Sequence, residues 1–148
     1  MSTKNLASAL YATIPYEYDF DFIVEHKNKE LKQVDGWDIQ SNTYSNPNYV
    51  RDGNKMSFTD IHHTIRATGF RGQTIEDFIM DTPLNIQSIA YDIAEKKLIG
   101  EIGIKALYEK VVRINNRAQA EHYIKLKNKT LEEYVNEKAK DIDFKVEY

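Results

Sequence analysis

The chain has 148 residues, of which 41% are hydrophobic and 29% are charged, and its formal net charge is −3. This length and composition predict one folded domain that can bury a core, and the small net charge argues neither for nor against a nucleic-acid partner. Because the chain has no cysteine, disulfides, thiolate zinc sites and a cysteine nucleophile are excluded.

The charge is distributed unevenly along the chain. Residues 1–104 carry 10 Lys/Arg against 15 Asp/Glu, residues 105–129 carry 7 against 2, and residues 130–148 carry 3 against 6. An acidic first two-thirds is therefore followed by a basic band and an acidic tail.

No apolar run approaches the 18 residues of a membrane-spanning helix, and the first residues lack the apolar core of a signal peptide. The simplest expected location is the cytoplasm. The abundance of Asn, Lys, Ile and Tyr suits an AT-rich bacterium or a phage.

The first predicted elements are a short helix over residues 3–12 and a strand over residues 16–24, separated by Pro15. The strand alternates strictly, so its two sets of side chains point to opposite faces. An aromatic inner face is expected from Tyr16, Tyr18, Phe20 and Phe22, and an acidic outer face from Glu17, Asp19 and Asp21.

Carboxylates two positions apart on a strand lie about 7 Å apart and repel one another unless a cation lies among them. Two interpretations of this acidic face remain open. It is either a site for a divalent metal ion or a solvated strand face.

Asp35-Gly36 is a turn signal, and a short strand is expected to follow it as far as Gln40. Residues 41–54 are rich in Asn, contain Pro47 and Gly53, and are predicted to form a long loop. A second strand is predicted over residues 55–67.

Thr74 with Asp77 three positions later predicts a capped helix that reaches about Met80, since Pro83 prevents its continuation. The helical spacing of Ile86, Ile89, Ala90 and Ile93 predicts a second helix over residues 85–95. Residues 97–102 are expected to form a brief strand or turn.

Helices are predicted over residues 104–112 and 117–127, with a possible short strand over residues 111–114 between them. Thr130 with Glu133 predicts another capped helix, to about Ala139. The alternating residues 141–148 predict a terminal strand. The mixture of elements indicates a single α+β domain over 1–148, with a small mixed β-sheet flanked by helices. Within it, residues 1–104 are expected to form an acidic core, and residues 105–148 a basic helical band with the terminal strand.

Residues 76–99 resemble the head domain of tRNA nucleotidyltransferases and bacterial poly(A) polymerases. The residues that carry the resemblance are Glu76-Asp77, then Leu-Asn-Ile-Gln-Ser-Ile-Ala-Tyr-Asp at 84–92, then Lys-Leu-Ile at 97–99. In that family an acidic pair precedes Arg-Arg-Asp-Phe-Thr-Ile-Asn-Ala and an apolar-Ala-Tyr segment. Gly103 to Leu107 and Lys110 to Ile114 are similar to the segments that follow in the family, and Asp19-Phe20-Asp21 is similar to its Asp-x-Asp strand.

The resemblance implies a nucleotidyltransferase-like protein that transfers a nucleotide from a nucleoside triphosphate to an RNA or another acceptor. It implies Mg²⁺ (or Mn²⁺) held by Asp19, Asp21 and Asp60, the catalytic carboxylates, with Glu17 as a further metal ligand. Ions in such a site bridge the carboxylates and the substrate phosphates.

The sequence departs from the family pattern in two places. The family has a glycine turn before the acidic strand, which receives the triphosphate, but this chain has no glycine before Gly36. The family's Arg-Arg-Asp is here Asp81-Thr82-Pro83. The alternative is therefore a catalytically degenerate relative that acts as a non-enzymatic binding or assembly protein.

The basic band is a second candidate binding region, because basic groups interspersed with aromatic residues can contact a nucleic-acid backbone and stack on bases. Its candidate nucleic-acid contacts are Lys105, Lys110, Arg113, Arg117, Lys125 and Lys127. The alternative is a solvated helix face.

Overall fold

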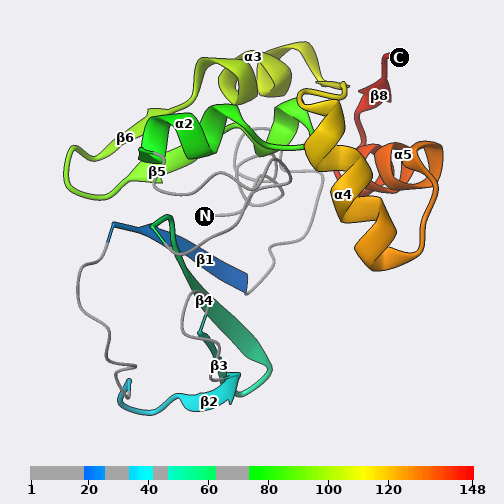
Figure 1. The fold of residues 1–148 in the computed structure, drawn as a ribbon. Helices are drawn as coiled ribbons and strands as arrows, with labels where there is room; N and C mark the ends of the chain where they lie inside the picture. Colours follow the sequence, from blue (N-terminus) through cyan, green and yellow to red (C-terminus); the bar gives the residue numbers. More distant parts are fainter. Residues whose placement is uncertain (1–18, 26–33, 42–46, 63–73) are drawn as a thin grey trace.

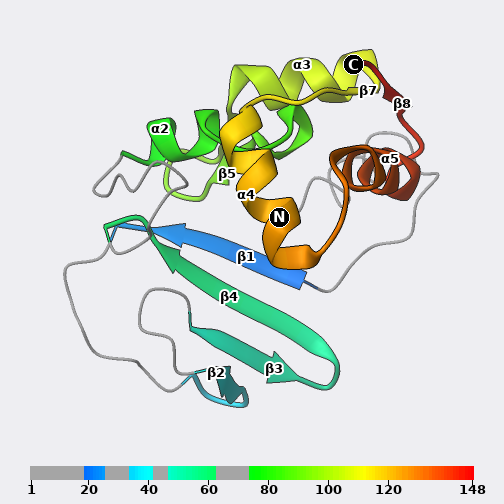
Figure 2. The same cartoon turned by 45° about the vertical axis from the view of Figure 1, so that its right-hand side comes forward.

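The computed structural model describes residues 19–25, 34–41, 47–62 and 74–148. In these residues a four-stranded sheet lies beside a mainly helical part, and β1 is the strand nearest the helices (Figures 1 and 2). The predicted helix over residues 3–12 lies outside the described residues.

The sheet is mixed and has the strand order β1-β4-β3-β2. Its strands are β1 (Asp19–Val24), β2 (Asp38–Ser41), β3 (Asn48–Arg51) and β4 (Asn54–Asp60). β1 runs parallel to β4, whereas β3 is antiparallel to both β4 and β2. The predicted strands over 16–24 and up to Gln40 are confirmed where they are described.

One face of the sheet is aromatic. The rings of Phe22 and Phe58 stack with their centroids 5.1 Å apart, and Tyr49 meets Phe58 edge-on at 5.8 Å. Tyr49 is buried, but Phe20 is 39% exposed. Of the expected aromatic face, Phe22 is therefore packed against other rings and Phe20 stays partly exposed, while Tyr16 and Tyr18 lie outside the described residues.

The predicted loop over residues 41–54 is wrong in its second half, because β3 and β4 form a hairpin there. The hairpin turns at Asp52 and Gly53, which both have positive φ, at 50° and 81°. Asp-Gly in two left-handed positions is the most favourable two-residue hairpin turn, since its twist matches that of the strands. This signal was present in the sequence.

Of the strand predicted over 55–67, the described residues form a strand only as far as Asp60, and residues 63–67 lie outside them. The Asp60 carboxylate accepts the backbone N–H of His62 at 3.0 Å, and residues 61 and 62 form a turn. A side chain that accepts a nearby backbone N–H offers the chain an alternative to the sheet ladder.

The capped helix at Thr74 is confirmed as α2 (Ile75–Met80), with Thr74 Oγ1 accepting the N–H of Asp77 at 3.1 Å. The helix predicted over residues 85–95 is wrong. A 3-10 turn, η1 (Asn85–Gln87), is followed by a hairpin of β5 (Ala90–Asp92) and β6 (Lys97–Ile99).

The physical reason lies in two polar side chains. Asn85 Oδ1 accepts the N–H of Ile86, and Asp92 Oδ1 accepts the N–H of Glu95 at 3.0 Å. Both bonds compete with a helical backbone. Ile93, expected on the buried face of a helix, is 65% exposed in the hairpin turn.

The remaining elements follow the predicted pattern closely. They are α3 (Glu101–Glu109), β7 (Val111–Val112), α4 (Arg117–Lys127), α5 (Leu131–Asp141) and β8 (Lys145–Val146). β8 pairs in parallel with β7 and is shorter than the predicted strand over 141–148. Ile142 and Phe144 from the alternating tail are nevertheless buried.

A buried hydrophobic core lies within residues 84–146. Leu84 and Ile86 pack there with Leu107 of α3, Val112 of β7 and Tyr134 of α5. Because α3 spans the change of charge at residue 104, the division into 1–104 and 105–148 describes charge and does not separate two structural units. The predicted α+β architecture, a small mixed sheet with helices, is confirmed.

Candidate functional site

The acidic face of β1 is the first part of the candidate site. Asp19 lies opposite Lys55 of β4 and Asp21 lies opposite Ser57, in a parallel register that places each pair on one face of the sheet. Ser57 Oγ donates a hydrogen bond to Asp21 Oδ1 at 2.5 Å. Asp21 is exposed and Asp19 is half-buried.

The structure does not bring Asp60 together with these two carboxylates. Asp60 lies opposite Val24, which is three positions beyond Asp21 and is on the other face of the sheet, together with Phe22 and Phe58. Three residues of strand correspond to roughly 10 Å along the sheet. Asp60 is also buried, at 4% exposure. The structure thus does not place Asp60 beside Asp19 and Asp21, because consecutive side chains of a strand point to opposite faces of the sheet.

Asp19 and Asp21 offer only oxygen ligands, which suits Mg²⁺ (or Mn²⁺), an ion that proteins hold by one or two carboxylates with substrate phosphates completing its shell. Among the described residues, no three His, Cys, Asp or Glu side chains form a group that could hold a metal ion without such help. Glu17, the further predicted ligand, lies outside the described residues. The pair therefore fits a metal ion that arrives with a phosphate ligand.

Asp81 is held by amide side chains at the start of α4. Its carboxylate accepts hydrogen bonds from Asn116 Nδ2 and, at 2.9 Å, from Gln119 Nε2. The next residue, Thr82, is buried and its hydroxyl lies 2.6 Å from Ser88 Oγ. This segment is thus tied into the fold by polar contacts.

Asn115 completes this connection. Its Nδ2 donates to the carbonyl oxygens of Met80 at 2.8 Å and Thr82 at 2.9 Å, which joins the end of α2 to the start of α4. The contacts of Asn115, Asn116 and Gln119 were not predicted from the sequence. Only the position of Asn116 just before α4, as the helix N-cap, was a readable signal.

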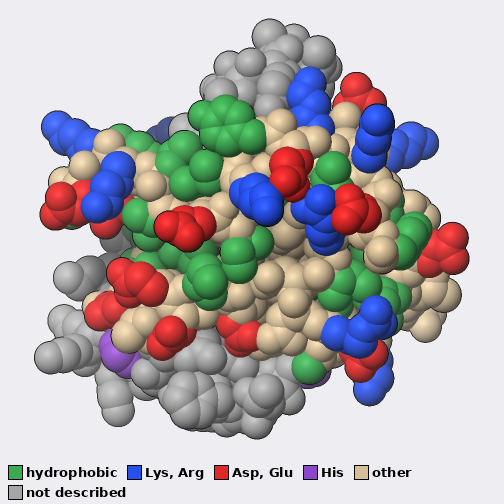
Figure 3. Space-filling view, turned by 90° about the horizontal axis from the view of Figure 1, so that it is seen from above, with side chains coloured by type: hydrophobic (Ala, Val, Ile, Leu, Met, Phe, Trp, Pro, Cys, Tyr) green, Lys and Arg blue, Asp and Glu red, His purple; other side chains and the backbone are tan. Residues whose placement is uncertain are grey.

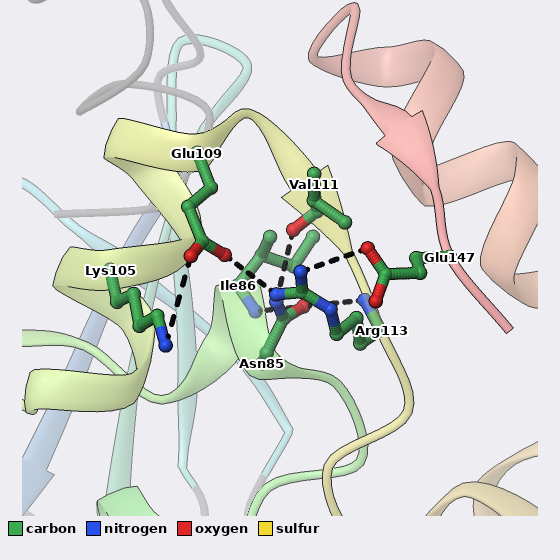
Figure 4. A network of polar contacts seen from close by, with 7 residues as sticks. All are labelled: Asn85, Ile86, Lys105, Glu109, Val111, Arg113 and Glu147. Atoms are coloured by element: carbon green, nitrogen blue, oxygen red, sulfur yellow. Dashed lines mark hydrogen bonds and ion pairs between the residues drawn. The ribbon is translucent and has the colours of Figure 1, made fainter.

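Arg113 lies at the centre of a polar network (Figure 4). Its backbone N–H donates to Asn85 Oδ1 at 2.8 Å, while its guanidinium donates to Glu109 at 2.7 Å and to Glu147 at 2.9 Å. These hydrogen bonds hold the pKa of both carboxyl groups below the usual value of 4.5 and raise the pKa of Arg113. Lys105 lies 3.7 Å from the other oxygen of Glu109.

The charge of Arg113 is therefore balanced by two carboxylates, which leaves this predicted nucleic-acid contact engaged within the protein. The other predicted contacts are exposed on α3, α4 and the turn between them: Lys105, Lys110, Arg117, Lys125 and Lys127.

The structure does not gather these basic residues into one patch. Arg117 and Lys127 stand at opposite ends of α4, about 15 Å apart along the helix axis. Lys127 Nζ lies 5.9 Å from the ring centre of Tyr123. Figure 3, which views the helices from above, shows acidic and basic side chains interspersed on that face. Lys125 and Lys127 form the basic end of α4.

No helix among the described residues is long and apolar enough to cross a membrane. No protein-family model matches the sequence, and no curated protein matches it either.

The structure is similar to two solved structures of a tRNA-processing enzyme. One, described as the enzyme with CTP, matches with a TM-score of 0.63 and 16% sequence identity over 97% of this chain and 38% of that chain. The other, an apo form, matches with a TM-score of 0.62 and 17% identity over 97% of this chain and 37% of that one. This chain thus spans well under half the length of the proteins it matches.

The expectation drawn from residues 76–99 is confirmed for the fold. The chain has the α+β fold of the matched part of a tRNA-processing enzyme.

Proposed function

We propose that this protein is nucleotidyltransferase-like: it binds a nucleoside triphosphate with Mg²⁺ (or Mn²⁺) and transfers a nucleotide to an RNA or another acceptor. The observation that carries the proposal is the similarity in fold, over 97% of the chain, to a tRNA-processing enzyme described with CTP. The Asp-x-Asp of β1 supports it, because it presents two carboxylates on one face of the sheet, and carboxylate oxygens are the ligands that Mg²⁺ prefers.

In this proposal Asp19 and Asp21 hold the metal ion beside the triphosphate. A metal ion held by these two carboxylates would supply neutralisation of the phosphate charge in an in-line displacement. The two carboxylates fix its place on the sheet, and the neighbouring Lys55 adds a positive charge on the same face. Asp60 lies on the opposite face and has a structural role here.

The acceptor is proposed to contact the basic end of α4 through Lys125 and Lys127. Further phosphate contacts are proposed for Lys105, Lys110 and Arg117. The contribution of Arg113 is expected to be the smallest, because its guanidinium forms ion pairs within the protein. Charge reversal of Lys125 and Lys127 to Glu is expected to weaken RNA binding and to reduce its salt dependence. Charge reversal at Lys138 and Lys140 on α5 is the control. Unchanged RNA affinity in the α4 variant would contradict this part of the proposal.

A second candidate is a catalytically degenerate relative that binds without catalysing transfer. Two observations favour it: the third carboxylate, Asp60, faces away from Asp19 and Asp21, and Asp81 with its amide partners occupies the segment where the family has arginines. On this candidate the nucleotide or RNA is bound and released unchanged.

Calorimetric titration and a transfer assay test both candidates. Mn²⁺ or Mg²⁺ is titrated into the protein with and without CTP or ATP, and incorporation of labelled nucleotide into a tRNA or an RNA end is measured. Metal-dependent nucleotide binding that is lost in Asp19→Ala and Asp21→Ala, together with incorporation, supports the enzyme. Binding without incorporation supports the degenerate relative, and the absence of both metal and nucleotide binding would refute both.

A further inference from the structure

The described residues of β4 place a serine, and no acid, beside Asp21. On the face that carries Asp19 and Asp21, β4 presents Lys55, Ser57 and Thr59. The one acid of β4, Asp60, is on the other face. The neighbouring strand therefore supplies hydroxyl and ammonium groups to the acidic face of β1.

Ser57 has a defined contact with this face. Its Oγ donates to Asp21 Oδ1 at 2.5 Å, which is a short bond of the kind that a hydroxyl forms with an ionised carboxylate. Among the described residues Asp21 has no other hydrogen-bond or ion-pair partner, so its second oxygen, Oδ2, is available to a ligand.

The bond lies in an exposed place, where a hydrogen bond between side chains contributes little to folding. Its effect on the carboxylate is more specific. A carboxylate side chain on a strand face rotates among several conformations. Fixing each of these rotations when an ion binds costs entropy, which lowers the affinity of a site that has only two carboxylates. Ser57 fixes one oxygen of Asp21 before any ligand arrives.

We propose that Ser57 is a positioning residue that holds Asp21 through Oδ1, so that Oδ2 binds the metal ion of a metal–nucleotide complex. This inference rests on the proposed nucleotide site. It adds two points to that proposal. Asp21 binds the metal ion through one oxygen only, and the neutral hydroxyl of Ser57 occupies the place beside it that a third carboxylate would otherwise take. The metal ion then binds weakly alone and gains its remaining ligands from the triphosphate.

The test measures Mn²⁺ affinity at a saturating concentration of a non-hydrolysable CTP analogue, by calorimetry and by the electron paramagnetic resonance signal of free Mn²⁺. Four variants are compared with the wild type: Ser57→Ala, Ser57→Thr, Asp21→Asn and Thr59→Ala. Thr59 is the matched control, because it lies two positions along β4 on the same face, opposite Ile23.

Ser57→Ala is expected to weaken Mn²⁺ binding about 3- to 10-fold, the loss of one modest hydrogen bond. Ser57→Thr retains a hydroxyl and is expected to bind within about 2-fold of the wild type, while Asp21→Asn abolishes binding and Thr59→Ala changes nothing. Thermal midpoints of Ser57→Ala and wild type are expected to coincide, which a merely structural role would not produce.

Each other outcome overturns the inference. Wild-type Mn²⁺ affinity in Ser57→Ala, an equal loss in Thr59→Ala, or no rescue by Ser57→Thr refutes the positioning role while the nucleotide site stands, provided that Asp21→Asn loses binding. If the wild type itself binds no Mn²⁺ in the presence of the CTP analogue, the nucleotide site fails and this inference fails with it.

Discussion

Gly103 lies directly against the backbone of Ser88. The N–H of Gly103, in the first turn of α3, donates to the carbonyl oxygen of Ser88 at 3.1 Å. A Cβ at position 103 would lie 2.5 Å from that oxygen and 2.6 Å from Cβ of Ile89. Glycine therefore lets α3 approach the segment after η1 closely enough to bury Leu107 against Ile86.

Gly103→Ala is expected to lower the free energy of unfolding by about 2 kcal/mol, because the added methyl group must push α3 away from backbone atoms. If the space beside position 103 were open, the same substitution would raise the free energy of unfolding, because alanine has a higher helix propensity than glycine. Urea unfolding measures the change. Tyr108→Ala is the control on the same helix, since Tyr108 is 75% exposed, and is expected to stay within about 0.5 kcal/mol.

Because Asp60 and Asp21 lie on opposite faces of the sheet, substitutions of Asp60 are expected to affect stability and substitutions of Asp21 to affect metal binding. Asp60→Ala removes the acceptor of the His62 N–H and is expected to cost about 1 to 2 kcal/mol of stability. Asp60→Asn keeps an acceptor oxygen and is expected to bind Mn²⁺ with CTP as the wild type does, whereas Asp21→Asn keeps its stability and loses the metal. Loss of metal binding by Asp60→Asn at unchanged stability would contradict the register of β1 and β4.

The ion pairs of Arg113 predict a stability difference that depends on pH. Arg113 lowers the pKa of Glu109 and Glu147, so the bonds contribute fully above pH 4.5, the ordinary value, and their contribution is lost as pH falls through the lowered pKa values. The thermal midpoint of Glu147→Gln is expected to lie below that of the wild type at pH 7 and to approach it in acid.

High salt is expected to shrink the same difference at pH 7, because both ion pairs are partly exposed. Glu121→Gln serves as the control, since Glu121 is exposed and has no ion pair among the described residues. A gap between Glu147→Gln and wild type that does not shrink at all as the pH falls below 4.5 toward full protonation of the carboxyl groups would show that the ionised pair is not its cause.

The capping box of α5 predicts the effect of a single hydroxyl. Thr130 Oγ1 accepts the N–H of Glu133 at 3.1 Å, and Glu133 Oε2 accepts the N–H of Thr130 at 2.8 Å. Thr130→Ala is expected to lower the free energy of unfolding by about 1 kcal/mol. Thr130→Ser keeps a capping hydroxyl and is expected to retain most of the stability that the cap contributes. Chemical denaturation of the three proteins measures both, and equal losses in Ala and Ser variants would count against the cap.

Prediction from sequence was most successful where structure depends on neighbours in the chain. Thr74 and Thr130 begin their helices because each hydroxyl caps an N–H three residues on, and the alternation of residues 19–24 forms a strand. The hairpin turn at Asp52-Gly53 is equally local, although a loop was predicted there. The helix predicted over residues 85–95 was wrong for two reasons. The local bonds of Asn85 and Asp92 to backbone N–H groups compete with a helix, and Asn85 is also held from far along the chain, by Val111 and Arg113.

The candidate site divides in the same way. Local pattern alone established that Asp19 and Asp21 share a face of one strand, since side chains two apart on a strand always do. Which residues of β4 stand beside them was decided by the register between strands that are more than thirty positions apart in the chain. That register brings Ser57 to Asp21 and turns Asp60 to the opposite face, and it depends on packing such as that of Phe22 on Phe58, which no local pattern contains.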